Sequence, residues 1–502
     1  MDDSSDEISS SLSSTGIPGL DDILSGGFPS HQLYLVEGTP GTGKTTLALQ
    51  FLLEGRERGE TVLYITLSET RRELLAVARS HGWSLEGIHI HEMEPLEATL
   101  SPDHQVTLFH PSELELSETT GKVLKTVEEI QPSRIVFDSL SEMRLLAQSS
   151  LRFRRQILAL KQFFSGRKTT VLLLDDLTGP GDDHQLQSIA HGVIHLEQLA
   201  TEYGAERRRL RVMKMRATSF RGGLHDFVLR RGGIDVFPRL VAADHHTDFE
   251  DQEASSGIPS LDQLLGGGLP FGTSTLLMGP AGTGKSSVSL SFCVSAAKRG
   301  ERSALFLFDE TIALVKTRAR KLHMPLEPHI EAGLITLRQI EPAELSPGEF
   351  ASSIQRAVEG KDGCSPARLV VIDSLNGYLI SMSEEKQLTS QLHELFKYTS
   401  QQGILMLVTL SQTGMGGMSL RSPVDSTYLA DNVLMFRNFE AFGQLRRAIA
   451  VTKKRSGAHE LSLRELRMDS QGISISAPLY DFQGVLTGVP TYHGQGDPRN
   501  QP

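Results

Sequence analysis

Residues 38–45 read GTPGTGKT and residues 279–286 read GPAGTGKS, and both fit the phosphate-loop pattern G-x-x-x-x-G-K-[ST]. Each follows a short apolar run and precedes an apolar stretch, which is the strand–loop–helix context that the pattern requires. The glycines let backbone N–H groups surround phosphates, and the start of a helix adds partial positive charge. A glycine-rich turn is the simpler alternative for one copy, but two copies argue against it. The sequence therefore predicts two nucleoside triphosphate sites, each with Mg²⁺.

The two loops supply the predicted nucleotide-binding residues. Lys44 and Lys285 are expected to reach the β- and γ-phosphates, and the hydroxyls of Thr45 and Ser286 are expected to bind Mg²⁺. The complete predicted sets are Gly38, Thr39, Gly41, Thr42, Gly43, Lys44, Thr45 and Thr46 in the first loop, and Gly279, Gly282, Thr283, Gly284, Lys285, Ser286 and Ser287 in the second.

Two aspartates end apolar runs further along the chain, Asp138 in RIVFDSL and Asp373 in LVVIDSL. A carboxylate at that position of a phosphate-loop protein orients Mg²⁺ or its water. In isolation, each could equally be an aspartate that begins a loop. Beside a phosphate loop, we interpret Asp138 and Asp373 as metal-site residues together with Thr45 and Ser286.

The chain is a duplication. GIPGLDDILSGGFP begins at residue 16 and GIPSLDQLLGGGLP at residue 257, and Lys44 and Lys285 keep the same offset of 241 residues. Near-continuous apolar runs such as LYLVE, VLYITL, RIVFDSL, TVLLLDD and GVIHLE alternate with helical stretches such as 151–164, which favours an α/β fold with a mostly parallel sheet flanked by helices. The predicted organisation is a disordered lead (1–13), a first domain (14–241), a linker (242–256), a second domain (257–484) and a flexible tail (485–502).

The second strand of each copy ends in acids. YITLSET has Glu69 after Ser68, whereas LFLFDET has Asp309 and Glu310. A phosphoryl acceptor needs a group that orients it and takes its proton, and a carboxylate can do both. A solvated acidic loop is the alternative. We interpret Glu69, Asp309 and Glu310 as catalytic candidates.

Each copy also ends in a pair of cations, Lys214 and Arg216 in MKMR and Lys453 and Arg455 in TKKR. Both pairs lie almost a domain away in sequence from their own phosphate loop. In ring ATPases such cations often enter the neighbouring subunit's site and stabilise transition-state charge. The alternative is a solvated charge pair on an edge strand.

Composition limits the other functions. The chain has 502 residues, a net charge of −11 and two cysteines, Cys293 and Cys364, which argues against a disulfide framework or a cysteine zinc site and fits a cytoplasmic location. No apolar run is long enough for a membrane helix. The acidic balance opposes a broad nucleic-acid surface.

The ordered set of motifs resembles the KaiC family within the RecA-like ATPases, and especially its bacterial members outside cyanobacteria. The similarity extends from about residue 14 to about residue 493. It rests on GIPGLDDILSGGFP, GTPGTGKTT, YITLSET, FHPSELELSET, RIVFDSLSEMRLL and RFRRQILALKQFF in the first copy, and on GIPSLDQLLGGGLP, GPAGTGKSS, LFLFDET, VIDSLNGY, YLADNVLMFRNFE, KKRSGAH and GVLTGVPTYHG in the second.

The resemblance implies two tandem RecA-like domains in a double ring of six chains, with ATP between neighbouring chains. It also implies a slow ATPase in the first domain, serine/threonine autokinase activity in the second, and a protein partner that is KaiB-like or belongs to a two-component pathway. Clock members of the family carry Glu-Glu in both domains, whereas this chain has Ser68-Glu69 and Asp309-Glu310. The copy with two acids is therefore the one expected to move phosphate onto protein.

The phosphoacceptor is the second departure from the family. Clock members have an adjacent Ser-Thr just before the strand read here as DNVLMF, and that pair aligns with Thr427 and Tyr428. Ser426-Thr427 is thus displaced by one position, and Thr427 is the first candidate acceptor, with Ser426 the second. A simple turn in DST is an equal alternative. Two rival functions also remain open: a DNA-dependent RecA-like motor, and a nucleotide-gated scaffold with little turnover.

Overall fold

The structure is a computed structural model of the chain, and it describes residues 11–93, 111–147, 149–177, 185–201, 204–341, 343–361, 363–381, 388–412, 428–487 and 490–494. The chain forms two compact units, Met1–Arg239 and Leu240–Pro502.

The first unit is built on a sheet with nine strands in the described residues, in the order β11-β10-β9-β8-β3-β7-β6-β4-β5. Every pair from β8 through β5 is parallel, and β9, β10 and β11 extend the sheet as antiparallel strands. The five apolar runs predicted as strands are confirmed as β3, β4, β6, β7 and β8. The strands are β3 (Leu33–Glu37), β4 (Val62–Thr66), β5 (His89–Glu92), β6 (Arg134–Asp138), β7 (Thr170–Asp175), β8 (Gly192–Leu199), β9 (Arg207–Met215), β10 (His225–Arg230) and β11 (Gly233–Phe237).

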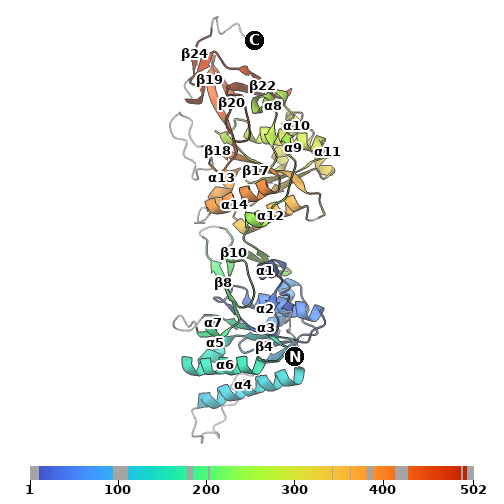
Figure 1. Cartoon of the computed structure of the whole chain (residues 1–502), viewed down its shortest axis with the longest axis vertical. Coiled ribbons are helices and arrows are strands. Elements are labelled where there is room, and N and C mark those ends of the chain that lie inside the picture. Colours follow the sequence, from blue (N-terminus) through green and yellow to red (C-terminus); the bar gives the residue numbers. More distant parts are fainter. Residues whose placement is uncertain are drawn as a thin grey trace, which may run out of the picture. The chain divides into compact units, whose positions relative to one another are not determined.

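Helices cover both faces of this sheet, as the continuous apolar strands require. Buried side chains of α1 (Pro18–Ile23), α2 (Lys44–Glu57) and α3 (Arg71–His81) pack in one core, and those of α4 (Pro111–Ile130), α5 (Leu140–Ala147), α6 (Ser150–Phe164) and α7 (Gln185–Ile189) pack in a second core. The predicted helix over 151–164 is confirmed as α6. Figure 1 shows α2 and α3 apart from α4, α5 and α6.

The second unit repeats this plan. Its sheet, counted over the described residues, has nine strands in the order β16-β15-β17-β18-β14-β19-β20-β21-β22, with β20 to β22 antiparallel. The strands are β14 (Ser274–Gly279), β15 (Arg302–Leu307), β16 (Ile335–Gln339), β17 (Ala367–Asp373), β18 (Leu405–Ser411), β19 (Asn432–Ala441), β20 (Gln444–Lys454), β21 (Arg464–Asp469) and β22 (Gly472–Pro478). The predicted α/β fold with two tandem RecA-like domains is therefore confirmed.

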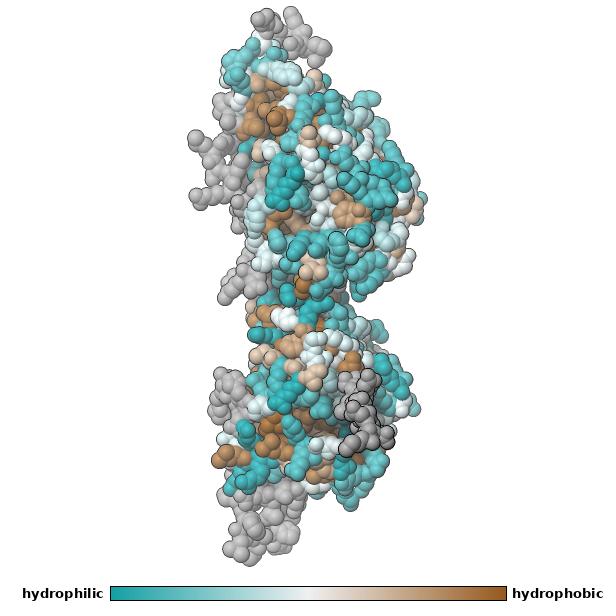
Figure 2. All heavy atoms as spheres, viewed as in Figure 1, coloured by the Kyte–Doolittle hydropathy of each residue, from teal (hydrophilic) through white to brown (hydrophobic). Residues whose placement is uncertain are grey.

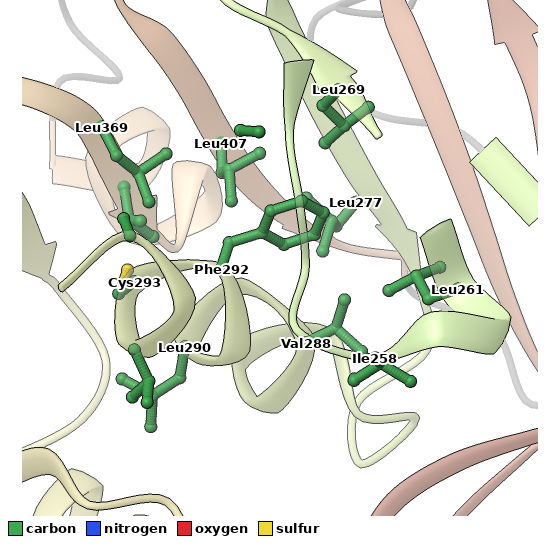
Figure 3. Close-up of a cluster of buried hydrophobic side chains, with 14 of the residues drawn as sticks. Ile258, Leu261, Leu269, Leu277, Val288, Leu290, Phe292, Cys293, Leu369 and Leu407 are labelled. Atoms are coloured by element: carbon green, nitrogen blue, oxygen red, sulfur yellow. The ribbon is translucent and has the colours of Figure 1, made fainter. Parts of the chain in front are cut away.

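Two cores again lie on opposite faces of the second sheet. One contains α8 (Pro259–Leu265), α9 (Lys285–Lys298), α10 (Ile312–Lys321) and α11 (Leu326–Glu331), and the other contains α12 (Pro347–Glu359), α13 (Leu375–Ser381) and α14 (Leu388–Gln401). In Figure 3, Val288 and Phe292 of α9 point toward Leu277 of β14, so the helix that begins at the phosphate loop is fixed to the sheet by apolar packing.

Parts of the segments predicted to lie outside the domains are ordered. Leu12–Ser13 forms β1, which pairs with β2 (Phe28–Pro29). Within 242–256, Ala242 is buried in a core of the second unit, and Glu253–Ala254 forms β12 against β13 (Leu269–Pro270). In the tail, Thr491–Tyr492 forms β24 against β23 (Phe482–Gln483), just after a short 3-10 helix (Val485–Thr487). Ala242 and Ala254 are both buried, so small apolar side chains account for the added packing in 242–256.

The visible surface of each unit mixes hydrophilic and hydrophobic side chains (Figure 2). The exposed large apolar side chains include Leu145, Leu151 and Leu158 of the first unit. In the part of the chain that the structure describes, no helix is both long and apolar enough to cross a membrane.

Candidate functional site

The first phosphate loop connects β3 to α2 at the carboxyl end of the sheet. Gly43 caps α2 with a φ of 100°, a left-handed conformation that glycine adopts readily. The Lys44 ammonium donates to the carbonyl oxygens of Gly38 at 2.7 Å and Thr39 at 3.0 Å. The Thr42 hydroxyl donates to the same Thr39 oxygen at 2.8 Å. The loop is therefore curled around its own lysine.

The second loop has the same construction between β14 and α9. Gly284 caps α9 with a φ of 103°, and Lys285 donates to the carbonyl oxygens of Gly279 at 2.9 Å and Pro280 at 2.7 Å. Burial lowers the pKa of Lys285 to about 8, although the nearby Asp373 carboxylate opposes this effect. Such a partly desolvated ammonium gains from any anion that binds beside it.

Asp138 lies where the loop predicts a magnesium ligand. The Thr45 hydroxyl donates to Asp138 Oδ2 at 3.2 Å, and the buried Tyr64 hydroxyl donates to the same oxygen. Burial raises the pKa of Asp138, and the hydrogen bonds from Tyr64 and Thr45 oppose that rise. The predicted pair Thr45 and Asp138 is thus brought together.

The equivalent pair in the second unit is Ser286 and Asp373. Asp373 Oδ1 accepts from the hydroxyls of Ser286 at 3.0 Å and Thr409 at 2.5 Å. Burial raises the pKa of Asp373, and the Thr409 and Ser286 hydrogen bonds oppose it. Among the described residues, no cluster of three or more His, Cys, Asp or Glu could hold a metal ion. One hydroxyl and one carboxylate per unit suit Mg²⁺, which keeps waters and takes phosphate oxygens as further ligands.

Glu69 lies at the same sheet edge, just after β4. Thr66 of β4 pairs with Asp138 of β6, and the Leu67 amide donates to the Asp138 carbonyl at 2.7 Å. Glu69 Oε2 is buried, and it has no hydrogen-bond partner among the described residues. Burial, with repulsion from Asp138, raises the pKa of the Glu69 carboxyl to about 7. A carboxylate with that pKa is well suited to accept a proton near neutral pH.

The two acids of the second unit are both held by neighbours. Arg318 of α10 donates to both oxygens of Glu310, at 2.5 and 2.6 Å, and the Ser374 hydroxyl donates to Asp309 Oδ2. In the first unit, Ser139 occupies the position of Ser374, and its buried hydroxyl has no hydrogen-bond partner in the described structure. Ser68 stands in place of Asp309, so the first unit lacks the acid that would accept this hydrogen bond.

The cation pair of the first unit lies far from its own phosphate loop. Gly192 pairs with Tyr34 near the start of β3 and with Met215 at the end of β9, so Lys214 and Arg216 lie at the edge of the sheet opposite the loop. Lys214 donates to the Gln187 carbonyl at 2.6 Å. Burial, with repulsion from Arg216, lowers the pKa of Lys214.

The second unit repeats this placement. Asn432 pairs with Thr275 near the start of β14 and with Lys454 at the end of β20, which puts Lys453 and Arg455 at the edge opposite the second loop. Lys453 donates to the Ala430 carbonyl at 2.6 Å, and Arg455 donates to Asp431 Oδ1 at 3.2 Å. The structure therefore does not bring either cation pair to the phosphate loop of its own unit.

Sequence reasoning missed several side chains that contact the site. They are Tyr64 and Thr409 on the metal-site aspartates, Ser374 on Asp309, Arg318 on Glu310, and Asp176, whose Oδ1 lies 2.8 Å from Lys44 Nζ. The offset of 241 residues could have singled out Arg318, because it aligns with Val77 in the first copy. Thr427 and Ser426, the candidate phosphoacceptors, lie outside the described residues.

Comparison with known proteins covers both units. A protein-family model described as "ATPase: KaiC" matches the chain twice, over residues 13–241 and 254–480. The chain is 28% identical to the circadian clock oscillator protein KaiC of Synechococcus elongatus over 477 residues, which is 93% of this chain and 89% of that protein. It is 27% identical to the protein of the same name from Acaryochloris marina over 478 residues, again 93% and 89%.

Proposed function

This chain belongs to the KaiC family of ATPases, and from that premise we propose that both of its units bind ATP with Mg²⁺ and hydrolyse it. The observation that carries the proposal is the repeated arrangement of a phosphate-loop lysine, a hydroxyl bonded to an aspartate, and an acid at the end of the next strand. Thr45 with Asp138, and Ser286 with Asp373, would hold Mg²⁺, which would supply charge neutralisation to the phosphates. Glu69 and Glu310 orient the acceptor and take its proton.

The cation pairs support assembly into a ring, which we propose is a hexamer. Lys214 and Arg216 lie at the sheet edge opposite their own loop, as do Lys453 and Arg455, so they do not reach the nucleotide of their own unit, and we propose that they act on the nucleotide of a neighbouring copy. A cation supplied in this way increases the rate of phosphoryl transfer by about 10³–10⁵-fold. Turnover then depends on contacts between chains.

We further propose that the second unit phosphorylates serine or threonine on the chain itself, with Thr427 as the first candidate and Ser426 as the second. Two acids are available there, Asp309 and Glu310, and each is fixed by a named hydrogen bond. The relatives named above are circadian clock oscillator proteins. On that basis the readout of the ATP cycle is a signal, passed to a KaiB-like or two-component protein partner.

The test is incubation of the full chain with γ-labelled ATP and Mg²⁺, with released phosphate and protein-bound label followed together. The proposal predicts both products, with the label reduced by Thr427→Ala and removed by Glu310→Gln. Glu327→Gln is the matched control, because Glu327 lies in α11 and, among the described residues, forms its ion pair with Arg320. Released phosphate without label would contradict the kinase half. If neither released phosphate nor label appears, the remaining alternative is a nucleotide-gated scaffold with little turnover.

A further inference from the structure

Lys44 forms an ion pair with a carboxylate, and among the described residues its counterpart Lys285 does not. Asp176 Oδ1 lies 2.8 Å from Lys44 Nζ, and Lys44 also donates to the carbonyl oxygens of Gly38 and Thr39. An ammonium group has three N–H donors, so protein atoms take all three. Among the described residues, Lys285 forms no ion pair. The two phosphate-binding lysines therefore differ in what a phosphate must displace.

The backbone assigns the equivalent position in the second unit to Ser411. In the first unit, Glu37 of β3 pairs with Asp175 of β7, so Asp176 follows directly opposite Gly38. In the second unit, Gly279 of β14 pairs with Ser411 of β18.

A tether at the strand end agrees with this alignment. The Asp176 amide donates to the Ser141 hydroxyl at 3.3 Å, and the Ser411 amide donates to the Asn376 side chain at 2.6 Å. Asn376 follows Ser141 by 235 residues, and Ser411 follows Asp176 by the same 235 residues, so the two hydrogen bonds join equivalent positions.

The residue before Asp176 fixes the backbone at the end of β7. Asp175 is buried, and Arg144 of α5 donates to both of its carboxylate oxygens, at 3.1 and 2.6 Å. The Gly38 amide donates to the Asp175 carbonyl at 3.1 Å. The end of β7 is thereby fixed to the start of the phosphate loop, which places the backbone of Asp176 beside Lys44.

We infer that Asp176 is a specificity-determining residue of the first nucleotide site, which weakens the binding of a nucleoside triphosphate more than that of a diphosphate. A phosphate-loop lysine contacts the β- and γ-phosphates, so Asp176 competes with them for one ammonium. Two anions close to one cation also repel each other, and the repulsion grows with the charge of the phosphate chain. Ser411 leaves the second site without this penalty. The ratio of triphosphate affinity to diphosphate affinity is therefore lower at the first site than at the second.

The inference rests on nucleotide binding at the first loop, as proposed above, and does not depend on hydrolysis. The test uses the full chain with the second site disabled by Lys285→Met, titrated calorimetrically with Mg²⁺ and either ADP or β,γ-imido-ATP. Asp176→Asn is expected to tighten binding of the triphosphate analogue by about tenfold, and that of ADP by less. Asp22→Asn is the control, because it removes an ion-paired carboxylate from the same unit at α1, where Asp22 pairs with Arg221.

The reciprocal change installs the carboxylate in the second unit. In the full chain with the first site disabled by Lys44→Met, Ser411→Asp is expected to weaken binding of the triphosphate analogue by about tenfold, whereas Ser411→Asn does not. If Asp176→Asn leaves the ratio of triphosphate to ADP affinity unchanged, or weakens triphosphate binding, the inference is overturned while the proposed function stands. If the chain with only the first site binds neither nucleotide, the proposed function of that site fails, and the inference fails with it.

Discussion

The two units each give the proposed magnesium-binding aspartate two hydroxyl donors, but they surround their candidate catalytic acids differently. Asp138 accepts hydrogen bonds from Thr45 and Tyr64, and Asp373 accepts them from Ser286 and Thr409. Asp138 ends β6 and Asp373 ends the equivalent strand β17. Tyr64 comes from β4, on one side of β6, whereas Thr409 comes from β18, on the opposite side of β17. The same requirement, a buried carboxylate with two hydroxyl donors, has thus been met from two directions.

The acids show the contrast. Glu69 has a buried oxygen with no hydrogen-bond partner among the described residues, and its pKa is raised to about 7 by burial, with a further contribution from Asp138. Glu310 is bound through both oxygens by Arg318, a residue that aligns with Val77 in the first unit. A duplicated fold can therefore keep its phosphate loops while the environment of its acids changes. The first site suits a base that titrates near neutral pH, and the second suits an acid fixed in one orientation.

The largest expected effect comes from removing each acid. In chains that retain one functional phosphate loop, Glu69→Gln and Glu310→Gln should each lower the rate of ATP hydrolysis by about 10²–10⁴-fold, because the acceptor loses its base. Phosphate release measured in the Lys285→Met and Lys44→Met backgrounds checks this. Glu57→Gln, an exposed substitution on α2, serves as the control. Equal rates before and after the change would exclude the acid from catalysis.

Removing the cation that fixes Glu310 should have the next largest effect. Arg318→Met is expected to lower kcat of the second unit by about 10- to 100-fold with little change in KM, because a misplaced base slows the chemical step. Arg318→Lys should recover part of the rate. Arg320→Met is the matched control on the same helix, since Arg320 pairs with Glu327 instead. A change in KM alone would show that Arg318 acts on binding.

Installing that cation in the first unit should shift its pH profile. The Glu69 pKa of about 7 reflects burial and repulsion from Asp138, Glu73 and Asp176, opposed by Lys44. The base must be deprotonated, so the rate rises as pH increases through 7.

Val77→Arg adds a positive charge eight residues after Glu69, at the spacing of Arg318 from Glu310. It should move that rise lower by about one pH unit, which is about a fivefold faster rate at pH 6. Val77→Met controls for size. A profile unmoved by Val77→Arg would contradict the assignment of Glu69 as the base.

The smallest effect concerns stability. Tyr64→Phe removes a buried hydrogen bond to Asp138 and should lower the free energy of unfolding of the first unit by about 1 kcal/mol. Tyr34→Phe, which removes the hydrogen bond of another buried tyrosine to the Pro29 carbonyl, should cost a similar amount. Chemical denaturation measures both. Only Tyr64→Phe should change the Mg²⁺ dependence of nucleotide binding. If Tyr64→Phe and Tyr34→Phe show the same Mg²⁺ dependence, Tyr64 has no role in Mg²⁺ binding.

The sequence predicted the features that depend on local apolar patterns and on the internal repeat. Continuous apolar runs identified β3, β4, β6, β7 and β8, and the offset of 241 residues identified the duplication. The pairing of Thr45 with Asp138 followed from the usual geometry of a phosphate loop. The partners Tyr64 and Asp176 could not be predicted in the same way, because strand order brings them to the site from distant parts of the chain. A strand was expected at the first cation pair, but nothing in the sequence indicated β10, β11 or the antiparallel direction of β9, which puts Lys214 at the far edge.

The most direct test of two distinct nucleotide sites is the number of nucleotides bound per chain, measured by calorimetry with a non-hydrolysable ATP analogue and Mg²⁺. We predict two for the unmodified chain and one for each of Lys44→Met and Lys285→Met. One nucleotide bound to the unmodified chain, or a number that either substitution leaves unchanged, would contradict the account.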